Sequence, residues 1–137
     1  MSKKIYVNLP VKDLPKSKAF FASLGFAFEP NFTNEQGACM VVAGNIFVML
    51  LTEPFFQTFT KKPVADATKS TEVLVCLSTD SRASVDDLVA KAVEAGGSAP
   101  NPVQDHGFMY GHGFEDLDGH LWEVVYMQPD ANATTGS

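Results

Sequence analysis

The sequence predicts an α+β fold built from two βαβββ modules that form a curved mixed sheet around a cleft. One order of elements, a strand, an amphipathic helix and three further strands, occurs twice in halves of similar length. Each half is expected to place its helix on one face of its sheet, which leaves the opposite faces to line a cavity. A length of 137 residues suits one domain with a sizeable core.

The first half begins with a strand in which apolar residues alternate with Tyr6, Asn8 and Pro10, as expected for a period of two. Asp13 can cap the helix that follows, and Gly25 ends it. The apolar stripe of this helix is predicted at 17–24, and three strands are predicted after it at 26–32, 37–43 and 45–51.

A segment rich in proline and threonine, residues 53–70, reads as a linker between the halves. The order of elements then repeats. A strand is predicted at 72–77 and a helix capped by Ser84 at 84–95, followed by an edge strand at 99–104 and a final hairpin whose strands are 108–114 and 120–127. We therefore expect one domain and a small polar tail that is disordered. The domain is placed at 1–128, with its first module at 4–52 and its second at 71–128, and the tail is placed at 129–137.

The composition excludes several classes of function. A net charge of −6 and a pI near 4.9 argue against a nucleic-acid partner, because phosphates would be repelled. No apolar stretch reaches the roughly 18 residues of a membrane span, and the N-terminal residues lack the apolar stretch of a signal peptide. We therefore expect a cytoplasmic protein without a membrane partner, in which Cys39 and Cys76 are buried free thiols.

Two local segments resemble a known superfamily. Residues 8–17, Asn-Leu-Pro-Val-Lys-Asp-Leu-Pro-Lys-Ser, resemble the opening of vicinal-oxygen-chelate modules, and residues 114–123, Phe-Glu-Asp-Leu-Asp-Gly-His-Leu-Trp-Glu, resemble their closing hairpin. Leu117 stands where the family usually has proline, but the Asp and Gly residues of the turn remain. The chain is similar to the glyoxalase/bleomycin-resistance/dioxygenase superfamily, and most similar to its small bacterial predicted lactoylglutathione lyases.

The resemblance implies a homodimer that takes a small-molecule ligand. In metal-dependent members, His, Gln or Glu side chains on the first, fourth, fifth and eighth strands hold a divalent metal. In this sequence those positions correspond to Tyr6, Leu50 (or Met49), Leu74 and Glu123. Because Glu123 alone is of ligand type, we expect no metal ligands and no cofactor.

The final hairpin offers another candidate site. If 116–119 is a four-residue loop, His112 lies opposite Glu123, and the two could hydrogen-bond as a catalytic acid/base pair. The alternative is a structural ion pair. Further substrate contacts are predicted from Tyr6, Asn8, Leu50, Leu74 and Tyr110. The tyrosines and Asn8 could equally be ordinary sheet residues with one polar tip in water.

Two functions follow, and the sequence leaves both open. The first is a lactoylglutathione-lyase-like enzyme that acts on a small oxygenated substrate. The second is a metal-free protein that binds or sequesters a small molecule, as bleomycin-resistance proteins do. A cavity lined by leucines, a tyrosine and a few polar groups suits binding without chemistry.

Overall fold

The structure is a computed structural model that describes residues 3–129. Its contacts divide the chain into two units, with the boundary between Asp66 and Ala67. Each unit contains a four-stranded sheet with both parallel and antiparallel pairs. The predicted α+β fold of two βαβββ modules is confirmed. The predicted tail lies, from residue 130 on, outside the described residues.

The first unit carries its sheet in the strand order β1-β4-β3-β2. Its elements are β1 (Ile5–Val11), α1 (Leu14–Ser23), β2 (Ala27–Phe28), β3 (Gly37–Ala43), β4 (Ile46–Thr52) and α2 (Glu53–Gln57). β1 is parallel to β4, whereas β3 is antiparallel to both of its neighbours. The predicted tight turn at 44–45 joins β3 to β4, with Ala43 paired to Ile46.

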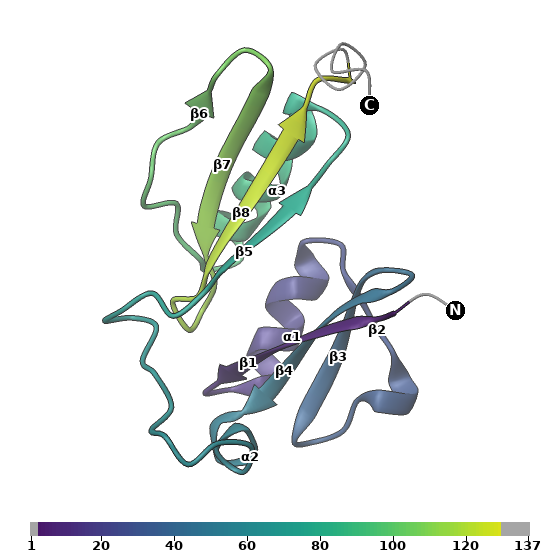
Figure 1. Ribbon diagram of the computed structural model, residues 1–137, viewed down its shortest axis with the longest axis vertical. Helices are drawn as coiled ribbons and strands as arrows, with labels where there is room; N and C mark the ends of the chain where they lie inside the picture. The colour runs from purple at the N-terminus through teal and green to yellow at the C-terminus, as the bar shows by residue number, and fades with distance from the viewer. Residues whose placement is uncertain (1–2, 130–137) are drawn as a thin grey trace. The chain divides into compact units, whose positions relative to one another are not determined.

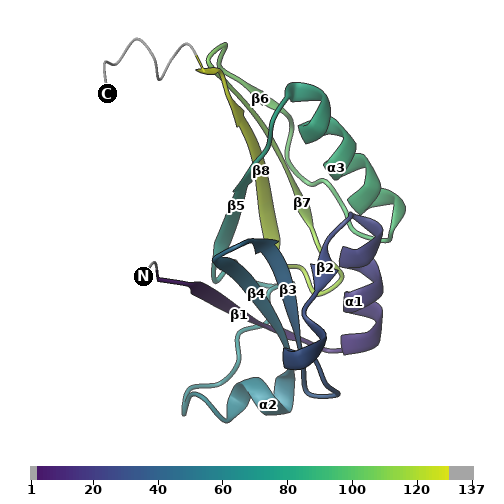
Figure 2. The same ribbon diagram turned by 90° about the vertical axis from the view of Figure 1, so that its right-hand side faces the viewer.

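Helix α1 forms the core of the first unit with one face of this sheet (Figure 2). The Asp13 side chain caps the helix by accepting a hydrogen bond from the Lys16 amide at 3.1 Å. Gly25 follows the helix with a φ of 102°, a conformation that glycine adopts without strain. The residues buried between helix and sheet are Leu9, Leu14, Phe20, Phe21, Ala38, Met40, Val48 and Leu50.

The second unit repeats this arrangement with the strand order β5-β8-β7-β6 (Figure 1). Its elements are β5 (Leu74–Ser78), α3 (Arg82–Glu94), β6 (Gln104–Asp105), β7 (Met109–Glu115) and β8 (Leu121–Met127). β5 is parallel to β8, and β7 is antiparallel to β6 and β8. In each unit, we call the sheet face that the helix covers the helix face and the opposite one the open face.

Helix α3 packs on β7 and β8. Its N-cap is Ser81, whose hydroxyl accepts a hydrogen bond from the Ser84 amide at 3.0 Å, so the predicted cap at Ser84 was wrong by one turn. The core of this unit consists of Val85, Val89, Ala92, Phe114, Trp122 and Val124. Within residues 3–129, no helix is long and apolar enough to span a membrane.

A buried aspartate shapes the loop between β7 and β8. Asp116 is 6% exposed, and its Oδ1 accepts hydrogen bonds from the backbone amides of Asp118 and His120 at 2.9 and 3.0 Å. Its Oδ2 accepts one from Trp122 Nε1 at 3.0 Å. Burial raises the pKa of Asp116, whereas His120 and these hydrogen bonds act in the opposite direction. The loop therefore extends to His120, and Glu115 pairs with Leu121.

Several predicted elements are shorter than the sequence patterns indicated. The strand predicted at 26–32 reduces to β2 and a 3₁₀ turn at Pro30–Phe32. The edge strand predicted at 99–104 reduces to β6 and a bridge between Ser98 and Glu115. Proline explains both differences, because it has no amide hydrogen to donate to a sheet and stands in each segment. The predicted linker contains the short helix α2.

Candidate functional site

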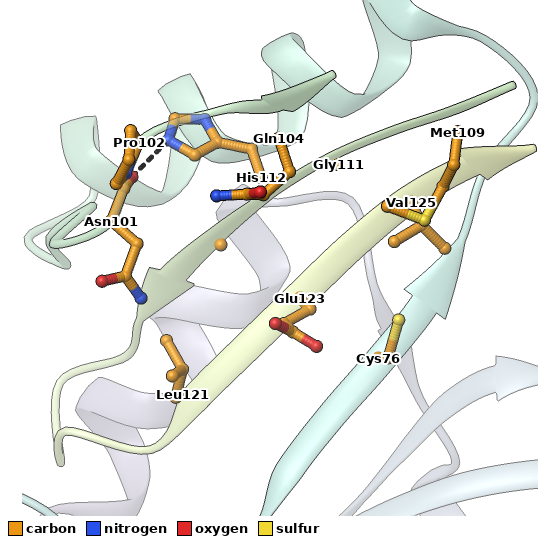
Figure 3. Close-up of a pocket in the computed structure, with 11 residues that line it drawn as sticks. Cys76, Asn101, Pro102, Gln104, Met109, Gly111, His112, Leu121, Glu123 and Val125 are labelled. Carbon is orange, nitrogen blue, oxygen red and sulfur yellow. Dashed lines mark hydrogen bonds between the residues drawn. The ribbon is translucent and has the colours of Figure 1, made fainter. Parts of the chain in front are cut away.

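A cavity of about 500 Å³ opens on the open face of the second sheet (Figure 3). This volume lies within the range of small-molecule sites. The floor comes from β5, β7 and β8, and one wall comes from the segment that leads into β6. The lining residues are Cys76, Asn101, Pro102, Gln104, Met109, Gly111, His112, Gly113, Leu121, Glu123 and Val125.

The register between β7 and β8 decides which side chains reach the cavity. Phe114 pairs with Trp122, and both are fully buried against α3, so this pair marks the helix face. Strand residues alternate between the two faces, so Leu121, Glu123 and Val125 of β8 lie on the open face. On β7, Val125 pairs with Gly111, Glu123 pairs with Gly113 and Leu121 pairs with Glu115.

Among the residues that the structure describes, Glu123 is the only carboxylate that lines the cavity. Its side chain is exposed, and within residues 3–129 no hydrogen bond or ion pair engages it. No lysine or arginine of the described part of the chain lines the cavity. The site therefore presents an uncompensated negative charge above a largely apolar floor.

Cys76 lies beside Glu123, to which it is paired in the sheet. Burial raises the pKa of the Cys76 thiol, and the neighbouring Glu123 carboxylate raises it further, so the neutral thiol is favoured. The prediction that both cysteines are buried holds for Cys39 but is wrong for Cys76, which is exposed.

The predicted pairing of His112 with Glu123 is wrong. Because the loop is one residue longer than expected, His112 pairs with Val124 and Glu123 pairs with Gly113, so the two lie on opposite faces by register. His112 nevertheless reaches the cavity at the edge of the sheet, where its Nε2–H donates to the Asn101 carbonyl oxygen at 3.0 Å. Figure 3 shows the His112 ring turned toward Asn101 and Pro102 rather than toward Glu123.

The same one-residue shift in register moves Tyr110 away from the sheet face on which it was predicted. It lies on the helix face, and its hydroxyl donates a hydrogen bond to Asp86 Oδ1 on α3 at 2.6 Å. The Arg82 guanidinium stands 4.9 Å from the centre of its ring and forms an ion pair with Asp105. This hydrogen bond raises the pKa of Tyr110. The residue therefore ties helix to sheet and does not line the cavity.

The other predicted contacts divide between the two units. Leu74 lies on the open face of the second sheet and is 53% exposed. Leu50 is fully buried on the helix face of the first sheet, and not on the open face where a substrate contact was predicted. Met49, the alternative at that position, pairs with Asn8 on the open face, and Tyr6 stacks there on Phe47 with 5.0 Å between ring centres.

Comparison with known proteins places the chain in a family. The model of the Glyoxalase/Bleomycin resistance protein/Dioxygenase superfamily matches residues 5–124. The chain belongs to this superfamily. The comparison with curated proteins finds no match.

Solved structures of the superfamily fold resemble the chain over most of its length. Hypothetical protein SA1046 from S. aureus is 30% identical, with a TM-score of 0.77 and coverage of 92% of this chain and 95% of that one. The antibiotic binding protein TnmS3 from Streptomyces sp. CB03234 is 20% identical, with a TM-score of 0.66 and coverage of 93% and 97%. The fosfomycin resistance protein FosX from Listeria monocytogenes is 18% identical, with a TM-score of 0.67 and coverage of 95% and 97%. The last two similarities establish the fold alone.

The donor atoms of this chain do not fit the divalent metal that superfamily membership implies. The open face of the second sheet offers one carboxylate, Glu123, beside the thiol of Cys76. The open face of the first sheet offers the side chains of Tyr6, Asn8 and Met49 at the corresponding positions. Within the described residues, no group of three His, Cys, Asp or Glu side chains is placed to hold a metal.

Several cavity residues were missed by the sequence analysis. They are Cys76, Asn101, Pro102, Gln104, Met109, Gly111 and Gly113. Only the two glycines left a readable signal, since they recur with the period of two that marks one face of a strand. The wall residues at 101–104 lie outside regular structure for most of their length, and no periodicity could have placed them.

Proposed function

We propose that this protein binds a small, positively charged organic molecule in the cavity of its second unit, without a metal ion. One observation carries the proposal: the Glu123 carboxylate lies in a cavity of about 500 Å³, and no cationic side chain among residues 3–129 lies beside it. A protonated amine or amidine would neutralise this charge, and Met109, Leu121 and Val125 would contact its apolar part. The net charge of −6 would favour the approach of a cation.

The superfamily relatives support binding as a function of this fold. One of the solved structures is an antibiotic binding protein and another is a fosfomycin resistance protein. Capture of a small molecule by this chain would need only a shaped cavity and an anchoring charge. It would not need the ligand set that metal-dependent catalysis demands.

Thermal unfolding tests the proposal with a panel of cationic, neutral and anionic small molecules in the presence of EDTA. We expect cationic compounds to raise the unfolding temperature of the wild type and to lose this effect with Glu123→Gln. The matched control is Glu94→Gln, which removes an exposed carboxylate of α3 outside the cavity. Equal stabilisation by neutral and anionic compounds would contradict the role of Glu123.

Calorimetry with Ni²⁺, Zn²⁺, Mn²⁺ and Fe²⁺ tests the metal-free part of the proposal. We expect no tight binding, because within the described residues no three His, Cys, Asp or Glu side chains, those of Cys76, His112 and Glu123 included, are placed to hold a metal. Tight, near-stoichiometric binding that depends on Glu123 would overturn this part and revive a metal-dependent lyase.

Acid–base catalysis of the lactoylglutathione-lyase type is a second candidate. It is favoured by the position of His112, which lines the same cavity as Glu123. With Nε2 donating to Asn101, the neutral ring keeps Nδ1 as its basic nitrogen. Turnover of a glutathione hemithioacetal that Glu123→Gln and His112→Asn both abolish would favour this candidate. The homodimer and the cytoplasmic location stay predictions; light scattering at a multiple of 14.8 kDa would test the first.

A further inference from the structure

Two side-chain carboxamides stand in the wall of the cavity. Asn101 and Gln104 both line the cavity, and both are exposed. Within residues 3–129, no hydrogen bond engages the side-chain amide of either residue. Each carboxamide has an oxygen that accepts hydrogen bonds and an NH₂ group that donates them. We call these two side chains the amide wall.

Contacts of the backbone hold the amide wall in place. Gln104 lies in β6 and pairs with Gly111 of β7, so its side chain lies on the open face of the sheet. At the other end of the wall, the His112 Nε2–H donates to the carbonyl oxygen of Asn101 at 3.0 Å. This bond fixes the backbone at 101 and leaves the Asn101 side chain available for a ligand.

The amide wall and the Glu123 carboxylate lie on opposite sides of β7. Glu123 belongs to β8 and Gln104 to β6, and β7 runs between these two strands. Because neighbouring strands are about 4.8 Å apart, the backbones of β6 and β8 are about 10 Å apart. Figure 3 shows Asn101 and Glu123 on the two sides of β7. A ligand that contacts both polar groups must therefore cross β7.

Apolar side chains cover β7 along this path. Gly111 and Gly113 are buried, and the space where their side chains would stand is taken by neighbours. Cγ1 of Val125 lies 3.1 Å from the position of a Cβ atom at Gly111, and Cδ1 of Leu121 lies 3.7 Å from that position at Gly113. The surface between the carboxylate and the amide wall is therefore apolar, and it favours an apolar spacer in the ligand.

We infer that the ligand of this cavity carries, besides its cationic group, a neutral carboxamide that the amide wall binds. The cation pairs with Glu123, and an apolar spacer between the two groups packs on Leu121 and Val125. This inference rests on the proposed binding function and adds the second half of the ligand. A carboxamide suits the amide wall because it donates and accepts hydrogen bonds at once, as both side chains of the wall do.

Three probes of the same shape separate the two polar contacts. 6-Aminohexanamide carries both groups, 6-methylheptylamine has an isopropyl group in place of the carboxamide, and heptanamide has a methyl group in place of the ammonium group. NMR titrations of the wild type should show 6-aminohexanamide binding at least about fivefold more tightly than either of the others. The side-chain NH₂ signals of Asn101 and Gln104 should shift. The spacer should give contacts to the methyl groups of Leu121 and Val125.

Variants assign each preference to its residues. Gln104→Met combined with Asn101→Leu keeps the size of the wall and should remove the preference for 6-aminohexanamide over 6-methylheptylamine. The matched control is Gln36→Met, which changes an exposed glutamine outside the cavity and should leave this preference unchanged. Glu123→Gln should remove the preference for 6-aminohexanamide over heptanamide. The NMR spectrum of each variant reports whether it is folded. If the double variant does not fold, the shifts of the two NH₂ signals in the wild type decide.

The outcomes distinguish the inference from the function on which it rests. If 6-methylheptylamine binds as tightly as 6-aminohexanamide and both depend on Glu123, the role of the amide wall is wrong and cation binding stands. The same holds if the folded double variant keeps the preference for 6-aminohexanamide. If no cationic compound binds in a Glu123-dependent manner, the proposed function itself is wrong.

Discussion

The two units share one strand order and one helix position, but their open faces differ. In both, the helix face is filled by large apolar residues, such as Leu50 in the first and Trp122 in the second. The open face of the first sheet carries Phe47 and Met49 on β4, whereas that of the second carries Glu123 beside glycines. Packing against a helix constrains one face of each sheet, and the other face is free to diverge toward a binding site.

The largest expected effect tests whether a buried side chain on the helix face contributes more to the free energy of unfolding than an exposed side chain on the open face. Leu50→Ala should lower the free energy of unfolding by about 3 kcal/mol, because it leaves a cavity in a fully buried core. Leu74→Ala, the same chemical change at a side chain that is 53% exposed, should cost no more than about 0.5 kcal/mol. Urea unfolding measures both, and equal losses would contradict the assignment of faces.

The next effect compares the turns that join the last two strands of each unit. Asp116→Ala should destabilise the protein by about 2 kcal/mol, because it removes the acceptor of three hydrogen bonds, two of them buried and one partly buried. Asn45→Ala in the turn of the first unit should cost far less, since the side chain of Asn45 makes a single exposed hydrogen bond at 3.5 Å. Thermal unfolding compares the two, and a loss at Asn45 as large as that at Asp116 would count against this account.

The smallest effect concerns the cysteines, which lie on the open faces of the two sheets. Cys39 is 1% exposed, so iodoacetamide should alkylate only Cys76 in the native protein. Because burial first and the Glu123 carboxylate second raise the pKa of Cys76, less thiolate forms at neutral pH. Glu123→Gln should therefore speed its alkylation, because removal of the carboxylate lowers the pKa of the Cys76 thiol and more thiolate forms. Site-resolved mass spectrometry measures the rate, and an unchanged rate would mean that the two groups do not interact.

The one-residue register shift in the final hairpin shows a limit of prediction from sequence patterns. The sequence identifies the Asp-Leu-Asp-Gly turn but not the length of the loop. That length depends on the hydrogen bond from Trp122 to Asp116, which joins residues on the two sides of the loop. A difference of one residue moves every side chain of a strand to the other face. It therefore removed His112 and Tyr110 from the predicted face and brought the glycines of β7 there instead.

By itself, the sequence determined the repeated order of elements, the position of each helix and the superfamily. These features follow from local periodicity, caps and glycine signals, which depend on neighbours within a few residues. The tertiary structure decided the register of the hairpin, the burial of Leu50, the exposure of Cys76 and the cavity wall at 101–104. These features depend on contacts between residues far apart in the chain, and a local pattern carries no information about which of those contacts form.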